Sequence, residues 1–497
     1  MESLYNFTSY ELREKLFKKK VSSEEVVKSI YERIEEKEEK IKAFLYLCKK
    51  EEVLEKARRV DKKIALGEEV GKLAGIPVGI KDNMCVKGIP ATGGSKILKN
   101  FIPPYNATVI EKLLQEDVII MGKLNCDEFA MGSSNENSAC YPVRNPWDLN
   151  RVPGGSSGGS AASVAASEVI LSLGSDTGGS IRLPASFCGV VGIKPTYGRV
   201  SRYGLIAFAS SLDQIGPLSK DVRDGALMLE VISGYDRRDS TSVNMEVPPY
   251  LSLLEEDVKG LKVGIPEELT GDGIDEDIRK RLSEAVVLFE KLGVICETVS
   301  LPTLSYALPV YYIISSSEAS SNLARFDGVR YGYRDFTGED IFSMYKKTRG
   351  KGFGPEVKRR IMLGTYALSA GYYDACYLKA QKVRTLLKRD FERVFKDFDA
   401  LLSPVAPTTA FLIGEKIKDP LKMYLTDICT IPVNLAGLPS ISVPAGLIKG
   451  LPVGLQITGR IFEESTILRL AYSFEQNSGY HTVSVKYSRQ KPEESNY

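Results

Sequence analysis

The first fifty residues carry the pattern of amphipathic helices. Ser22 and Glu25 have the Ser-x-x-Glu spacing of a capping box, in which each side chain accepts a hydrogen bond from the other residue's backbone amide. Apolar side chains then recur at helical spacing, at Val26, Val27, Ile30, Tyr31 and Ile34. This spacing predicts a helix whose apolar face packs against the rest of the protein.

From about residue 73 onward, short apolar runs alternate with helical segments. Buried strands are predicted by the runs at 75–80, 118–121, 169–173, 438–445 and 451–459. Residues 260–300 repeat a strand-helix-strand pattern, and 356–398 predict one or two long helices. The alternation is typical of an α/β fold, in which helices cover a buried sheet.

The same pattern predicts how the chain is organised. We expect a helical N-terminal region at 1–72 that packs on the core, and a single α/β core domain at 73–485. The last segment, 486–497, is polar, and we expect it to be frayed.

Composition and charge exclude several classes of function. The 497 residues are 43% hydrophobic, and 66 basic side chains against 64 acidic ones leave a formal charge of +2. Such a chain has no large positive field with which to hold nucleic acid or an anionic membrane. The N-terminus lacks the apolar segment of a signal peptide, and no run approaches 18 apolar residues. We therefore expect a cytoplasmic protein without membrane contact.

Histidine and cysteine usage limits the possible chemistry. His481 is the single histidine, so a catalytic triad or a three-histidine metal site built on imidazole is disfavoured. The eight cysteines include no CxxC pair, so we expect reduced thiols and no metal site.

Two glycine- and serine-rich clusters, at 153–163 and 174–182, are the main candidates for function. A flexible linker, a phosphate-binding loop and a nucleophilic site all use such residues. Both clusters border apolar segments, which disfavours a linker, and the chain has neither a Walker A nor a GxGxxG motif. In a nucleophilic site, consecutive glycines let backbone amides converge on an oxyanion, and Ser180 would lie beside them.

A serine hydroxyl needs a neighbouring base before it can attack. Histidine is not available for this role, so the best remaining candidate is Lys81, which directly follows the apolar run GIPVGI. Taken alone, Lys81 could equally be a solvated lysine at the end of a strand.

These motifs together resemble the amidase signature family. The resemblance runs through GIPVGIKD at 75–82, PGGSSGGSAA at 153–162, GSDTGGSIRLP at 174–184 and CGVVGIKPTYGRVS at 188–201. It implies a large mixed, twisted sheet covered on both faces by helices. It also implies a catalytic triad of Lys81, a serine after a cis peptide bond (Ser156) and the nucleophile Ser180, which forms an acyl ester.

The chemistry of these side chains agrees with the implied roles. A free lysine is neutral in about one molecule in 2,500 at pH 7, a deficit of roughly 4.6 kcal/mol, so the site must desolvate Lys81. Ser156 can both donate and accept a proton, and can relay it from Ser180 to Lys81. We expect the backbone amides of the glycine-rich loop to form the oxyanion hole, those of Thr177, Gly178, Gly179 and Ser180.

Further segments resemble one branch of the family, the A subunits of the glutamyl-tRNA(Gln)/aspartyl-tRNA(Asn) amidotransferases. These segments are 317–332, 356–369, 407–411 and 431–439. The resemblance implies hydrolysis of the side-chain amide of glutamine, with Arg360 and Asp427 holding the backbone end of the substrate, and Tyr311 beside it. An arginine fork suits a carboxylate, and a carboxylate suits an ammonium group. Without the resemblance, Arg360 could belong to a solvated basic face and Asp427 could be a helix cap.

The resemblance also implies partners. Ammonia would pass to a B subunit that binds the mischarged tRNA, ATP and magnesium, and a small C subunit would complete a heterotrimer. We expect this chain itself to bind no cofactor and no metal. Two alternatives remain, a free-standing amidase that cleaves small amides without partners, and a catalytically inactive structural subunit. The sequence leaves open whether the acceptor is Glu-tRNA(Gln), Asp-tRNA(Asn) or both.

Overall fold

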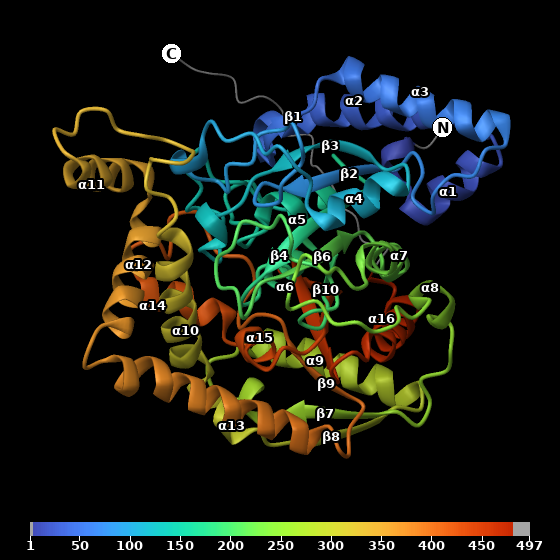
Figure 1. The fold of residues 1–497 in the computed structure, drawn as a ribbon. Helices are drawn as coiled ribbons and strands as arrows, with labels where there is room; N and C mark the ends of the chain where they lie inside the picture. The colour runs from blue at the N-terminus through green and yellow to red at the C-terminus, as the bar shows by residue number, and fades with distance from the viewer. Residues whose placement is uncertain (1–2, 481–497) are drawn as a thin grey trace, which may run out of the picture.

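The computed structural model describes residues 3–480, and within them the core is one eleven-stranded mixed sheet (Figure 1). Its strand order is β1-β3-β2-β4-β6-β5-β10-β11-β9-β7-β8. The strands are β1 (Phe44–Leu47), β2 (Pro77–Lys81), β3 (Ile119–Leu124), β4 (Leu171–Asp176), β5 (Val191–Lys194), β6 (Gln214–Ser219), β7 (Lys262–Pro266), β8 (Ile295–Val299), β9 (Ala400–Pro404), β10 (Ser440–Ile448) and β11 (Leu451–Gly459). The predicted α/β fold with a large mixed sheet is confirmed. His481 and the tail at 486–497 lie outside the described residues.

Helices surround this sheet. The α-helices are α1 (Ser9–Phe17), α2 (Ser23–Ile41), α3 (Lys50–Leu66), α4 (Thr108–Gln115), α5 (Gly158–Ala165), α6 (Arg182–Cys188), α7 (Val222–Ile232), α8 (Tyr250–Leu253), α9 (Glu276–Lys291), α10 (Ala307–Leu323), α11 (Ile341–Gly352), α12 (Pro355–Leu368), α13 (Lys379–Val394), α14 (Pro420–Tyr424), α15 (Ile431–Ala436) and α16 (Glu464–Ser478). A short π-helix, η6 (Tyr373–Leu378), separates α12 from α13. The segment predicted as one or two long helices is therefore two.

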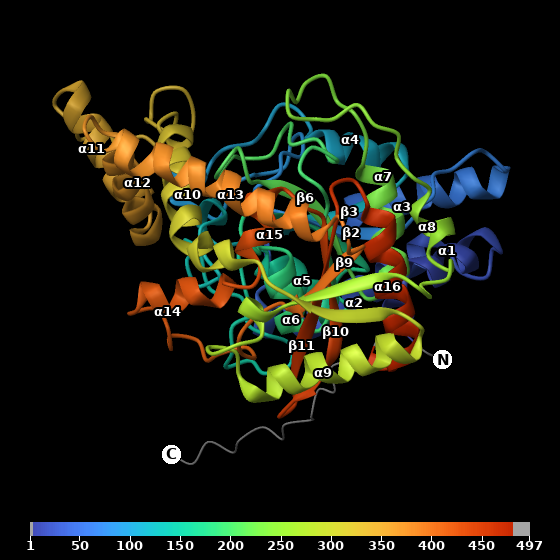
Figure 2. The same ribbon diagram turned by 90° about the horizontal axis from the view of Figure 1, so that it is seen from below.

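Alternating side chains show that helices cover both faces of the sheet. On β9, Leu401 packs in a cluster with Leu387 and Phe391 of α13, whereas Leu402 packs in a cluster with Phe289 of α9. Because successive side chains of a strand point to opposite faces, α13 and α9 lie on opposite sides of this part of the sheet. Figure 2 shows the same arrangement, with the strands between the two helices.

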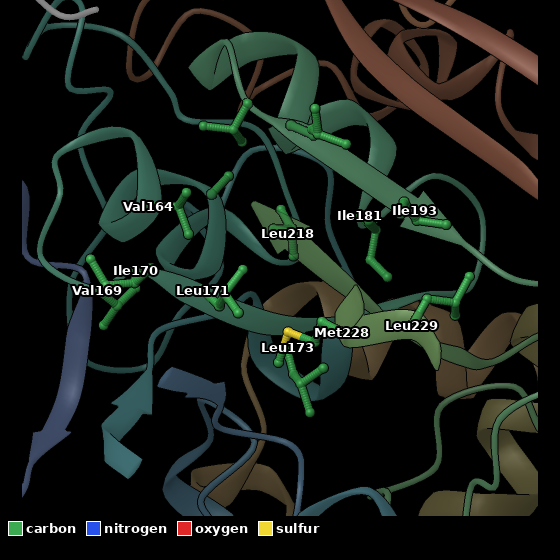
Figure 3. Close-up of a cluster of buried hydrophobic side chains, with 14 of the residues drawn as sticks. Val164, Val169, Ile170, Leu171, Leu173, Ile181, Ile193, Leu218, Met228 and Leu229 are labelled. Carbon is green, nitrogen blue, oxygen red and sulfur yellow. The ribbon is translucent and has the colours of Figure 1, made fainter. Parts of the chain in front are cut away.

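The centre of the sheet is held by a dense apolar core (Figure 3). Leu171 and Leu173 of β4 lie among Ile193 of β5, Leu218 of β6 and Met228 of α7, and all five side chains are fully buried. Burying each such side chain contributes about 1.5–3 kcal/mol. This packing fixes the position of β4, whose last residues reach the candidate site.

The N-terminal region agrees with the predicted helices and differs at one point. The capping box is present, since the Glu25 amide donates to Ser22 Oγ at 3.1 Å and the Ser22 amide donates to Glu25 Oε2 at 2.7 Å. The expectation that the first fifty residues are all helical is wrong at Phe44–Leu47, which forms β1 and pairs antiparallel with β3. Four apolar residues in a row do not distinguish a strand from a helix.

Candidate active site

The site begins where two parallel strands end. Strands β2 and β4 are parallel neighbours, so their carboxyl ends lie at the same edge of the sheet. Lys81, the last residue of β2, is fully buried there. Its Nζ lies 2.8 Å from Ser156 Oγ, 2.8 Å from Ser157 Oγ and 2.9 Å from Ser175 Oγ. The predicted Lys81–Ser156 contact is therefore present.

The surroundings of Lys81 favour its neutral form. Burial lowers the pKa of Lys81 to about 8, because the charged ammonium loses its water. At this pKa roughly one lysine in ten is neutral at pH 7, against about one in 2,500 for a free side chain. Desolvation therefore greatly raises the fraction of Lys81 that is neutral and able to accept a proton.

Ser156 is held by its own loop and by Asp127. The Gly155–Ser156 peptide bond is cis, as the family resemblance implies. The Asp127 amide donates to the Ser156 carbonyl at 3.2 Å. The Asp127 carboxylate accepts from the amides of Asn135 and Asn137 at 2.9 and 3.0 Å, and these contacts tie the 127–137 loop to the catalytic serine.

The loop from 176 to 181 takes its shape from a buried ion pair. The Asp176 carboxylate accepts from the Gly179 and Ile181 amides at 2.8 and 3.1 Å. The Arg182 guanidinium donates to both oxygens of Asp176 at 3.1 Å. Burial alone would raise the pKa of Asp176, but Arg182 outweighs it and holds the pKa at about 2. Asp176 therefore stays ionised and fixes the glycine-rich loop.

Ser180 lies in this loop beside the Ser156 segment. The Ser157 amide donates to the Ser180 carbonyl at 3.1 Å, so the two serine-rich segments are joined through their backbones. Ser180 is 7% exposed, so it lies nearly buried at the edge of the core. The three predicted triad residues thus lie at one end of β2 and β4.

The predicted oxyanion hole needs one correction. The amides of Thr177, Gly178 and Ser180 have no hydrogen-bond acceptor among residues 3–480 and are available to a ligand. The Gly179 amide is different, because it already donates to Asp176 Oδ1. We therefore leave Gly179 out of the candidate oxyanion hole. Its lack of a side chain still matters, since a Cβ there would clash with Thr430 Oγ1.

Arg360 is turned into the protein, away from the basic surface of its own helix. Lys358 and Arg359 are exposed, whereas Arg360 is 3% exposed. Its Nε donates to Glu356 Oε1 at 2.7 Å, and its guanidinium lies over the rings of Tyr312 and Tyr424 at 5.1 and 5.5 Å. The interpretation as a solvated basic face therefore holds for the neighbours of Arg360 but not for Arg360.

Asp427 lies next to the glycine-rich loop. One carboxylate oxygen, Oδ2, accepts from Ser133 Oγ, while Oδ1 is buried and has no hydrogen-bond partner among residues 3–480. A Cβ on Gly179 would lie 3.4 Å from Oδ1, which places this oxygen against the loop that carries Ser180. Burial raises the pKa of Asp427 to about 7. A cation bound at Oδ1 would favour the ionised form.

Tyr311 covers the other side of the same loop. A Cβ on Gly178 would lie 2.6 Å from Cζ of Tyr311 and 2.7 Å from its hydroxyl oxygen. Burial raises the pKa of the Tyr311 phenol, which therefore stays protonated and able to donate a hydrogen bond.

A cavity of about 550 Å³ opens beside these residues. Arg360, Glu356, Tyr424 and Gly132 contribute to its lining, whereas Ser180 and Asp427 do not. Gly132 adjoins Ser133, the partner of Asp427. The cavity thus approaches the candidate site from the side of Arg360.

Three residues around Lys81 were not predicted as part of the site. Ser157 and Ser175 contact Lys81 directly, and Asn83 Nδ2 donates to Ser175 Oγ at 2.8 Å. Asn83 stands two residues after Lys81 in a turn that follows β2, in which the Met84 amide donates to the Lys81 carbonyl at 3.1 Å, and no sequence pattern indicates its contact with Ser175. Both serines stand in the motifs that carry the resemblance, but the sequence does not show that they face Lys81.

Comparison with known proteins identifies the family of this chain. The amidase family model matches residues 25–468. The A subunit of the glutamyl-tRNA(Gln) amidotransferase from Carboxydothermus hydrogenoformans is 60% identical over 483 residues, which cover 97% of this chain and 99% of that protein. The corresponding protein from Geobacillus thermodenitrificans is 60% identical over 479 residues, covering 96% and 99%.

Solved structures show the same fold over nearly the whole chain. A crystal structure of the glutamyl-tRNA(Gln) amidotransferase A subunit from Thermotoga maritima matches with a TM-score of 0.79 and 45% identity, covering 96% of this chain and 95% of that one. A bacterial aryl acylamidase of the amidase signature family matches with a TM-score of 0.82 and 28% identity, covering 96% and 98%. On the family model, the relatives and the fold, this chain belongs to the amidase signature family.

Proposed function

We propose that this chain is the glutaminase component of a tRNA-dependent amidotransferase, and that it releases ammonia from glutamine for use by a partner subunit. The observation that carries the proposal is the 60% identity to an amidotransferase A subunit over 97% of the chain, together with a Lys81–Ser156 contact of 2.8 Å beside Ser180. A free-standing amidase shares the fold, but the aryl acylamidase is only 28% identical.

The chemistry follows from the residues at the ends of β2 and β4. Neutral Lys81 takes the Ser156 proton while Ser156 takes the Ser180 proton, so that Ser180 Oγ attacks the side-chain carbonyl of glutamine. The amides of Thr177, Gly178 and Ser180 donate to the resulting oxyanion. The proton returns along the same route to the leaving nitrogen, the C–N bond breaks and ammonia departs. Water then attacks the acyl ester and yields glutamate and free Ser180.

The backbone end of glutamine carries a carboxylate and an ammonium group. We assign the carboxylate to Arg360, which faces the cavity and keeps donors beyond its bond to Glu356. We assign the ammonium to Asp427, whose Oδ1 lacks a partner among residues 3–480. Tyr311 lies beside Gly178 and would contact one side of the substrate. In this arrangement the substrate enters from the cavity and directs its amide toward Ser180.

The binding of tRNA, ATP and magnesium would belong to the partner subunits. We propose a cytoplasmic heterotrimer in which the B subunit binds the mischarged Glu-tRNA(Gln) or Asp-tRNA(Asn), ATP and magnesium, and the C subunit completes the assembly. Within residues 3–480, no group of three or more His, Cys, Asp or Glu side chains could hold a metal ion. Over the same residues, no helix is long and apolar enough to cross a bilayer.

The test is ammonia release from glutamine by the purified chain, alone and with co-expressed B and C subunits, ATP, magnesium and mischarged tRNA. We expect the complete set to raise kcat/KM about tenfold or more, because coupling free energies of about 1–3 kcal/mol between sites are typical. Simple aliphatic amides should remain poor substrates under both conditions. Rapid cleavage of such amides by the lone chain, with no response to partners or tRNA, would instead establish a free amidase.

A further inference from the structure

Lys81 has three serine hydroxyls around its amine, but the proposed reaction uses one of them. Nζ lies within 2.9 Å of the hydroxyls of Ser156, Ser157 and Ser175. As an ammonium, Lys81 can donate one proton to each, and the Ser175 carbonyl lies further away, at 3.3 Å. As a neutral amine it keeps two protons and one lone pair, so one of the three hydroxyls must donate to it. The identity of that serine decides whether Lys81 serves as the base for the nucleophile.

The hydroxyl of Ser157 is fully committed elsewhere. Its oxygen accepts from Lys81 Nζ at 2.8 Å and from the Ser175 amide at 3.2 Å. Its own proton is donated to the Ser175 carbonyl at 3.1 Å. A hydroxyl has two lone pairs and one proton, so all three are used. Ser157 can therefore accept from neutral Lys81 but cannot donate to it.

The hydroxyl of Ser175 is restricted by Asn83. Its oxygen accepts from Lys81 Nζ at 2.9 Å and from Asn83 Nδ2 at 2.8 Å, which occupies both lone pairs. The bond from Asn83 does not depend on the charge of Lys81, so it keeps one lone pair occupied; when neutral Lys81 donates to the other, the Ser175 proton points away from the amine. Asn83 is 1% exposed, and its backbone carbonyl accepts from the Ile206 amide at 2.8 Å, which holds the backbone that carries this side chain.

Ser156 is the hydroxyl of the three that has no second hydrogen-bond partner among residues 3–480. Among residues 3–480 its oxygen contacts Lys81 and no other side chain, so its proton is free to point at the amine. We propose that Asn83 and Ser175, together with Ser157, are positioning residues that aim the lone pair of neutral Lys81 at Ser156. This inference rests on the proposed function, in which Lys81 is the base, and it assigns a role to side chains that touch neither substrate nor nucleophile.

The test is the pH profile of kcat/KM for glutamine, measured on the purified chain with its partner subunits. Ser175→Ala removes one of the three hydroxyl acceptors from the ammonium, so the rise in activity with pH should move to lower pH, and the plateau should fall about tenfold. Asn83→Asp places a negative charge near the ammonium, so the rise should move about one unit to higher pH. KM should change little in either variant.

Ser172→Ala is the matched control, because Ser172 is a buried serine on the same strand whose hydroxyl donates to Ser160 instead of Lys81. It should keep the wild-type pH profile. If Ser175→Ala and Asn83→Asp lower kcat without moving the pH profile, their role is structural and the inference fails. If Lys81→Met also retains activity, the proposed base itself is wrong, which separates the two failures.

Discussion

Replacing Ser180 with alanine is expected to lower the rate of ammonia release from glutamine by about 10⁴-fold or more. The substitution removes the oxygen to which the proposed mechanism assigns the acyl ester, while the backbone amides of the loop and the side chains assigned to the substrate remain. The fold should persist, because the Ser180 contact to Ser157 is made through its backbone carbonyl. The rate is measured by ammonia release under saturating glutamine, and folding by circular dichroism and thermal unfolding.

The control for this variant is Ser163→Ala. Ser163 is buried in α5, and its hydroxyl donates to the Ser160 carbonyl within the same helix. This variant should retain most of the activity. The acyl ester can also be detected directly, because added hydroxylamine should convert glutamine to its γ-hydroxamate with wild-type enzyme and not with Ser180→Ala. Unchanged glutaminase activity in Ser180→Ala would point to a structural subunit without catalysis.

Replacing Lys81 with methionine is expected to lower kcat by about 10²–10⁴-fold, the range for loss of a general base. Methionine fills similar space but cannot accept a proton. With wild-type enzyme, kcat/KM should rise with pH through about 8, because burial lowers the pKa of Lys81 to that value and the neutral form is active. Above this pH the curve should level off. The residual rate of Lys81→Met should lack this rise.

Lys220→Met serves as the comparison for Lys81→Met. Burial also lowers the pKa of Lys220 to about 8, but its Nζ donates to the Tyr5 carbonyl at 2.5 Å, in another part of the protein. The rise through pH 8 should survive this substitution. If the rise is lost in Lys220→Met and kept in Lys81→Met, another group controls the reaction.

The sequence predicted the parts of the site that stand in continuous motifs. Lys81 follows an apolar strand and Ser180 ends a glycine-rich loop, so local pattern and family resemblance led to these two residues, whereas Ser156 came from the resemblance alone. The central strands could be predicted for a similar reason, because a strand buried on both faces is a continuous apolar run. These features depend on short-range sequence.

Features that depend on long-range contacts could not be predicted in this way. The Gly179 amide looks equivalent to its neighbours in sequence. Asp176, which accepts from it, is only three positions away, but the same carboxylate is held by Asn434, which is 258 residues away and has no local signal. Ser175 is 94 residues from Lys81, and nothing local indicates their contact. One contact did have a local signal: Glu356 precedes Arg360 by four positions on a helix, the spacing of a salt bridge.

The most direct test of the proposed function is to follow the amide nitrogen. Glutamine labelled with ¹⁵N in its side-chain amide is supplied to the chain with its partner subunits, ATP, magnesium and Glu-tRNA(Gln), and the aminoacyl group is analysed by mass spectrometry. Wild-type complex should place ¹⁵N in tRNA-bound glutamine. The Ser180→Ala complex should place none there, yet should form unlabelled Gln-tRNA(Gln) when ammonium chloride replaces glutamine as the donor. Transfer of the label by the Ser180→Ala complex, or its absence with wild type, would contradict the proposed function.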